Sequence, residues 1–191
     1  EHFEKHPVQV LWWQWRGHLW ALLRDGLKLP LLQEPDRCFK PNAPTALHPN
    51  VDREFARLRR LGYIEGPYEA GDKQLRCVNA ALGVAKKDSP DKPRMCVNMT
   101  GSGVNESLEF IKFLYPSFDD CADLLYPGCW MGKVDLTDGF FHQRVAKASR
   151  KYLGVKLPDT GEMMRYTVFP FWLAVSPHYF CAAISEVHLL L

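Results

Sequence analysis

Two carboxylates, a glycine and two aromatic rings lie close together in the segment 133–143, which reads KVDLTDGFFHQ. A short apolar run ends at Asp135, so the sequence predicts a strand whose last residue turns a carboxylate out of the sheet. An acidic side chain at such a junction can hold a metal ion. Gly139 then places Phe140 about one helical turn from that carboxylate. Taken alone, Asp135 and Asp138 are explained equally well as a helix N-cap and a first-turn charge.

Basic residues gather in two other segments. Residues 75–100 read as two strands joined by DSPDKP, and this hairpin carries Lys86, Lys87 and Arg94 at or near its tip. The segment 144–156 contains five Lys and Arg residues and no acid. Such clusters either follow phosphate groups or keep a surface hydrated, and both interpretations stay open for each segment.

Helices and hairpins surround these segments. The apolar spacing predicts a helix from about 51 to 61 with its arginines mostly outward, a short helix at 118–125 and another at 138–148. The runs YLGVKL and MMRYTVF form a second hairpin, and Ser176-Pro177 opens a last helix. Without regular alternation of strands and helices, this mixture predicts an α+β fold.

The N-terminal part differs in composition. Apolar residues recur at helical spacing between 8 and 23, where four tryptophans lie, and this pattern predicts a buried helix face or else a base-stacking platform. Five prolines between 30 and 49 predict a linker or an extended arm.

Composition limits the class of protein. The chain has 191 residues, is 47% hydrophobic and balances 24 Lys and Arg against 22 Asp and Glu, so it is globular, and its net charge neither demands nor excludes a polyanionic partner. Six cysteines without a C-x-x-C pair, and the lack of a signal or membrane segment, predict an intracellular protein of the cytoplasm or nucleus with no membrane partner. The start at Glu1 and the apolar last residues are typical of a fragment.

Four motifs appear in order: FARLRRLGYIE, VAKKDSPDKPRMCVNMT, KVDLTDGFFHQ, and Pro170-Phe171-Trp172-Leu173 followed by Ser176-Pro177. From about Val51 to its end, the chain resembles the reverse transcriptases of long-terminal-repeat and DIRS-like retroelements. The resemblance implies right-hand polymerase fingers and a partial palm. It divides the chain into a Trp-rich helical extension with a Pro-rich linker (1–49), fingers (50–108), palm (109–144), a second fingers hairpin (145–170) and a second, truncated part of the palm (171–191).

The resemblance also implies roles for single residues. Lys86, less certainly Lys87, and Arg94 would hold the triphosphate of the incoming nucleotide, since ammonium and guanidinium groups donate charge-assisted hydrogen bonds to phosphate. A bulky ring at Phe140 would collide with a ribose 2′-hydroxyl, so deoxynucleotides are the expected substrate. The remaining nucleotide-binding positions would be Asp138, Gly139, Phe171 and Trp172.

The implied chemistry is template-directed addition of deoxynucleotides to a primer on RNA or DNA, with Mg²⁺ or Mn²⁺ as cofactor. Asp135 would be the catalytic metal ligand, joined by the backbone carbonyl of Leu136. Ser176 and Pro177 would start the helix beneath the template. Arg150 and Lys151 would contact template phosphates.

Two departures from the family pattern change the expectation. Trp172 replaces the usual glycine, whose backbone freedom a residue with an indole lacks. The sequence also contains no Tyr-x-Asp-Asp motif, and phosphoryl transfer by two metals needs carboxylates on both sides of the ion pair. We therefore expect no catalysis from this chain alone, and a non-catalytic nucleic-acid-binding relic is the second hypothesis. An α+β interaction module with an accidental likeness is the third.

Overall fold

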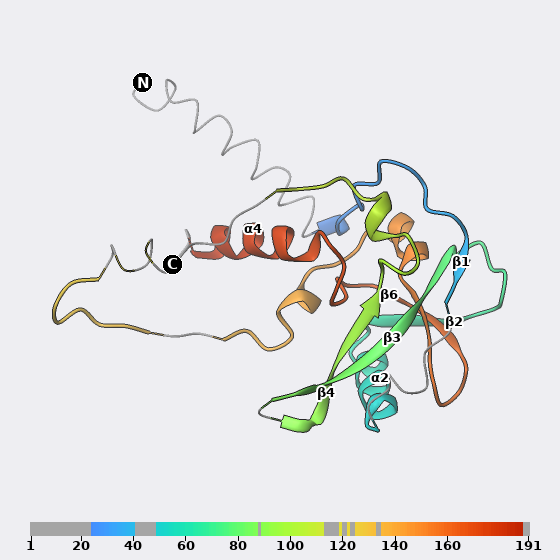
Figure 1. The fold of residues 1–191 in the computed structure, drawn as a ribbon, viewed down its shortest axis with the longest axis horizontal. Coiled ribbons are helices and arrows are strands. Elements are labelled where there is room, and N and C mark those ends of the chain that lie inside the picture. The colour runs from blue at the N-terminus through green and yellow to red at the C-terminus, as the bar shows by residue number, and fades with distance from the viewer. Residues whose placement is uncertain are drawn as a thin grey trace.

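A mixed sheet with a long protruding hairpin organises the chain (Figure 1). The computed structural model describes residues 24–40, 49–87, 89–112, 119, 122, 125–132 and 135–188, with side chains as far as 185. Within the described part the strands are β1 (Cys38–Phe39), β2 (Ile64–Tyr68), β3 (Cys77–Lys86), β4 (Ser89–Asn98), β5 (Gly154–Lys156) and β6 (Met163–Tyr166). Their order in the sheet is β1-β3-β5-β6-β2, and β4 pairs with β3.

The expected hairpin within residues 75–100 is confirmed as β3 and β4, which pair antiparallel from Ala80 opposite Asn98 to Lys86 opposite Ser89. A register shift between Ala85 and Lys86 brings part of the expected linker DSPDKP into β4, so the turn is shorter than predicted. The first half of β3 also pairs in parallel with β1 and β5. Because β3 belongs to both the hairpin and the sheet, the hairpin is rigidly attached to the body.

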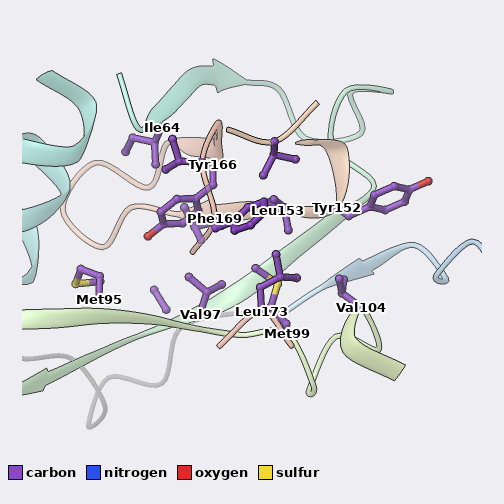
Figure 2. Packing of buried hydrophobic residues seen from close by; sticks show 14 of the residues in the cluster. Ile64, Met95, Val97, Met99, Val104, Tyr152, Leu153, Tyr166, Phe169 and Leu173 are labelled. Carbon is purple, nitrogen blue, oxygen red and sulfur yellow. The ribbon is translucent and has the colours of Figure 1, made fainter. Parts of the chain in front are cut away.

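The second expected hairpin is likewise confirmed, as β5 paired antiparallel with β6. Gly154 in β5 shows why a small residue is needed there, since a Cβ would lie 2.5 Å from the carbonyl oxygen of Cys77. The core lies between this sheet and the elements that cover it, with Tyr166, Phe169, Leu153 and Val97 fully buried (Figure 2).

Two helices begin where the sequence predicts them. Helix α2 (Val51–Arg60) buries Val51, Phe55 and Leu58 and packs against β4 and β2. Helix α4 (Ser176–His188) starts at the expected Ser-Pro. Three short 3-10 helices complete the described elements: η3 (Asn105–Ser107), η4 (Gly139–His142) and η5 (Lys147–Tyr152).

The expected helix at 138–148 is wrong. The structure has η4 and η5 instead, separated by an extended segment around Val145. The amide of Val145 donates to Thr167, and Arg144 accepts from Leu27, so this backbone is used in bridges to two other segments rather than in helical bonds. The Val145 side chain is buried in the core, and its contacts there stabilise the extended conformation.

Residues 133–134 of the expected strand ending at Asp135 lie outside the described residues, and no strand is present in the described residues on either side of them. Residues 125–132 and 135–136 are irregular and largely exposed, with Trp130 completely so. Backbone groups of a strand need a neighbouring strand, and the described residues supply none for this segment. The loop therefore stands away from the body (Figure 1).

The arm before α2 is more ordered than a linker. Leu27 and Leu29 are buried, β1 pairs with β3, and Glu34 accepts hydrogen bonds from Lys151 and Tyr152. The predicted helix at 8–23 and most of that at 118–125 lie outside the described residues. No helix in the described part is both long and apolar enough to cross a bilayer.

Candidate functional site

The turn that carries Asp138 is fastened to helix α2. Asp138 has a φ of 57°, in the left-handed region. Its carboxylate accepts two hydrogen bonds from Arg57, at 2.7 and 3.2 Å. Arg57 also binds Glu54, and this bond, followed by the bond to Asp138, raises the pKa of the guanidinium against the opposing effect of burial. One arginine thus fixes the start of η4 relative to α2.

An aromatic cluster lies directly behind that turn. The Phe140 ring centre is 5.2 Å from that of Phe171 and 5.4 Å from that of Phe180 in α4. The guanidinium carbon of Arg94 lies 5.7 Å from the centre of the Phe171 ring. A Cβ at Gly139 would be 3.0 Å from Phe180, so a larger residue there would push the Phe180 ring aside. Four predicted nucleotide-binding positions are therefore brought together from three distant parts of the chain.

The turn after Phe171 is held in a strained conformation. Trp172 has a φ of 75°, which glycine adopts freely and other residues rarely do. Asn105 holds it, donating to the Trp172 carbonyl at 2.9 Å and accepting from the Ala174 amide at 3.0 Å. Ser176 is fully buried and donates to the Pro170 carbonyl, so this serine ties the start of α4 to the same turn.

Replacing Trp172 by Gly should stabilise the protein by about 1 kcal/mol, because it removes the left-handed strain while the indole is 53% exposed. Chemical denaturation of both proteins measures the change. Trp130→Gly is the control, since Trp130 is exposed and has no positive φ, and it should give no gain. A destabilised Trp172→Gly protein would mean that the ring makes a contact worth more than the strain.

Asp138 also lines a basic pocket of about 790 Å³. Helix α2, the hairpin tip and the turn 137–138 form its walls. Lys86 lines it, whereas Lys87 and Arg94 are not among its lining residues. Its lining residues are Asn50, Arg53, Glu54, Ala56, Arg57, Arg60, Lys86, Asp91, Lys92, Pro93, Thr137 and Asp138. The structure thus places Lys86 with Asp138, and Arg94 with Phe171.

The described residues do not test the predicted metal ligands. Asp135 is exposed in the irregular segment, and Leu136 beside it is 45% exposed. Across the described residues no three His, Cys, Asp or Glu side chains come together as a metal would require. We therefore derive no step that involves a divalent cation. The roles of Asp135 and Leu136 stay predictions.

The two predicted template cations are engaged within the protein. Arg150 is only 13% exposed and donates to Glu65 and to the Val145 carbonyl. Lys151 pairs with Glu34 at 2.7 Å. Their contact with a template stays a prediction, and for Arg150 it would require breaking a half-buried ion pair. The nearby tyrosines Tyr152 and Tyr166 are buried in the core.

Sequence reasoning missed three residues that hold the site: Arg57, Asn105 and Phe180. The sequence predicts that the arginines of this helix point mostly outward, whereas Arg57 binds Asp138. Its spacing from Arg53 and Arg60 was a usable signal, since these positions share one helix stripe. Nothing local marks Asn105 or Phe180, whose partners lie far along the chain.

Comparisons with known proteins agree on the fold. No protein-family model matches the sequence. The chain is 23% identical over 164 residues to an enzymatic polyprotein of Cassava vein mosaic virus, which covers 84% of this chain and 24% of the polyprotein. This chain therefore spans about a quarter of that relative's length.

Solved structures of foamy virus protease-reverse transcriptase are similar as well. One, in complex with double-stranded DNA, has a TM-score of 0.59 and 18% identity, covering 87% of this chain and 26% of that chain. A selenomethionine-labelled mutant of the prototype foamy virus protein has a TM-score of 0.64 and 17% identity, covering 84% and 20%. At these identities the likeness establishes the fold.

Proposed function

We propose that this chain, which has the fingers and palm fold of reverse transcriptases, is the nucleotide-binding and template-binding part of a retroelement RNA-directed DNA polymerase. Its partners would be an RNA or DNA template with a primer, and deoxynucleoside triphosphates, with Mg²⁺ or Mn²⁺ as the metal of the complete enzyme. The single observation that carries the proposal is the meeting of Phe140, Phe171 and Arg94. The sequence separates these residues widely, and the resemblance assigns all three to one nucleotide site.

The chemistry of this group suits a nucleotide. Two aromatic rings offer flat apolar surface to a base or sugar, and a guanidinium beside them can bind phosphate oxygens. The Phe140 ring is half-buried and packed on two sides, so it cannot move aside easily. A rigid ring is what discrimination against a 2′-hydroxyl requires.

Phe140→Ala should reduce the preference for deoxynucleoside over ribonucleoside triphosphate by about tenfold. The measurement is titration of the full chain, with primer–template present, by each triphosphate in the same buffer. Phe140→Tyr is the matched control, because it keeps the ring and should keep the preference. A thermal unfolding curve for each variant separates loss of selectivity from loss of structure.

Two outcomes contradict the proposal: no preference in the unaltered protein, or an unchanged preference in a folded Phe140→Ala variant. The same titration addresses the second hypothesis, a nucleic-acid-binding relic without nucleotide chemistry. Trp172 at a glycine-like φ favours that hypothesis, because a strained residue stands next to Phe171. A relic would bind primer–template, with affinity falling as salt rises, yet show no difference between the two sugars.

A further inference from the structure

Helix α2 presents a row of arginines to the basic pocket. Arg53, Arg57 and Arg60 are spaced by four and three residues, so they lie on one stripe of the helix, next to the stripe that is buried in the core. Lys86 and Lys92 face them from the hairpin tip across the pocket. Two elements far apart in sequence therefore contribute cations to one space.

Most of these cations lack an acidic partner. Arg57 is engaged by Glu54 and Asp138, but Arg53, Arg60, Lys86 and Lys92 form no ion pair within the described residues. Asp91 also lines the pocket, and Asn50 donates to its backbone carbonyl at 2.8 Å. Counting all lining side chains, five positive charges face three negative ones, so the pocket carries net positive charge.

The start of α2 adds to this potential. Asn50, Arg53 and Glu54 place the first turn of this ten-residue helix in the pocket wall. The Asn50 side chain makes no capping hydrogen bond to the helix. The positive end of the helix dipole therefore lies at the pocket wall, where Glu54 of the same turn partly offsets it.

The geometry points to a phosphate-binding pocket that accepts a ligand with two or more neighbouring phosphate groups, bound by Arg53 and Arg60 of α2 together with Lys86 and Lys92 of the hairpin. The pocket volume lies within the range of about 300–1,000 Å³ that is typical of ligand pockets. A single small anion would therefore leave most of the cations and most of the volume unused. The phosphates belong either to a nucleoside triphosphate or to a nucleic-acid strand. The inference rests on the proposed function only for the identity of that ligand.

The test uses the full chain and two probes: sodium tripolyphosphate, measured by calorimetry, and a labelled oligothymidylate of about 20 nucleotides, measured by anisotropy. Arg53→Gln and Arg60→Gln should each weaken binding of at least one probe by about tenfold. Arg59→Gln is the matched control, since Arg59 lies on the same helix, pairs with Glu162 and does not line the pocket. It removes the same charge and should change affinity by no more than about twofold.

Weaker binding of tripolyphosphate identifies a triphosphate ligand, and weaker binding of the oligonucleotide alone identifies a strand. If neither probe binds, or if Arg59→Gln weakens binding as much as Arg53→Gln and Arg60→Gln, the pocket is only part of a diffuse positive surface and the inference fails. The protein could show no deoxynucleotide preference that depends on Phe140, while probe binding still depends on Arg53 and Arg60. That result would contradict the polymerase assignment but support the phosphate-binding pocket. If the preference at Phe140 is observed but binding does not depend on Arg53 and Arg60, the pocket inference fails and the polymerase assignment stands.

Discussion

Glu65→Gln is expected to lower the free energy of unfolding by about 3 kcal/mol, the largest effect of a single polar substitution in this protein. Glu65 accepts hydrogen bonds from Arg165 at 2.7 Å and from Arg150 at 3.0 Å, and both arginine side chains are nearly buried. Without the carboxylate, these two largely buried positive charges have no acid between them. Chemical denaturation measures the loss. Thermal unfolding should show a fall of roughly 6–12 °C.

The exposed pair of Arg59 and Glu162 supplies the control for this experiment. Glu162→Gln also removes a carboxylate from an arginine, but Arg59 is about half exposed and solvent can replace its partner. The expected loss is below about 1 kcal/mol. Equal losses in the two variants would show that burial does not set the strength of the Glu65 pairs.

The Glu65 network also predicts a pH dependence. Burial by itself raises the pKa of Glu65, but the hydrogen bond from Arg165 and the charges of both arginines outweigh it, so the pKa lies below its ordinary value of 4.5. Its contribution to stability is thus complete above that value and is lost as the pH falls through the lower folded-state pKa. Unfolding curves measured from neutral to acidic pH should decline less steeply in the Glu65→Gln protein.

Arg57→Gln should have the second largest effect, because one guanidinium neutralises both Glu54 and Asp138. We expect a loss of about 2 kcal/mol in unfolding free energy, smaller than for Glu65 because the carboxylates left unpaired, Glu54 and Asp138, are each 18% exposed, against 13% and 11% for Arg150 and Arg165. If the pocket binds phosphates, affinity for tripolyphosphate should fall about a hundredfold, because the change removes a cation and leaves two carboxylates unneutralised beside the ligand. Denaturation and calorimetry on the same samples give both quantities.

A second substitution tests this explanation. Combining Arg57→Gln with Asp138→Asn removes one unpaired carboxylate, and Asn tolerates the left-handed φ of 57° at this position. Part of both losses should be recovered. Arg59→Gln removes the same charge from another face of α2. It should lower neither the free energy of unfolding nor the free energy of tripolyphosphate binding by more than about 1 kcal/mol. No recovery in the double variant would mean that Arg57 acts by packing rather than by charge.

Helices and hairpins are predicted correctly where the apolar spacing and the turn residues indicate the same element. Helix α2, the hairpin of β3 and β4, the hairpin of β5 and β6, and the Ser-Pro start of α4 all lie where spacing and turn residues predicted them. Each depends on contacts between near neighbours in the chain, so a window of the sequence contains most of the information. The grouping of Phe140, Phe171 and Arg94 was also anticipated, but from the resemblance of ordered motifs rather than from local pattern.

Elsewhere the local pattern pointed to the wrong element. The segment 138–148 has helical spacing, yet Val145 pairs with Thr167 and bridges to Leu27, and these distant bonds replace the helix. The apolar run before Asp135 resembles a strand, but a strand exists only with a neighbour, and the described residues provide none there. In both cases the competing or missing partner is remote in sequence.

By itself, the sequence of this protein determined the class of fold, the hairpin with its cations, and the positions at which a nucleotide site was to be sought. Only the tertiary structure decided that Lys86 lines the pocket whereas Arg94 lies against Phe171. It also decided that Arg57 binds Asp138 and that the arginines of α2 face the hairpin tip across the pocket. The reason is physical: propensity and periodicity act over a few residues, whereas ion pairs and pockets depend on which surfaces meet when the core forms.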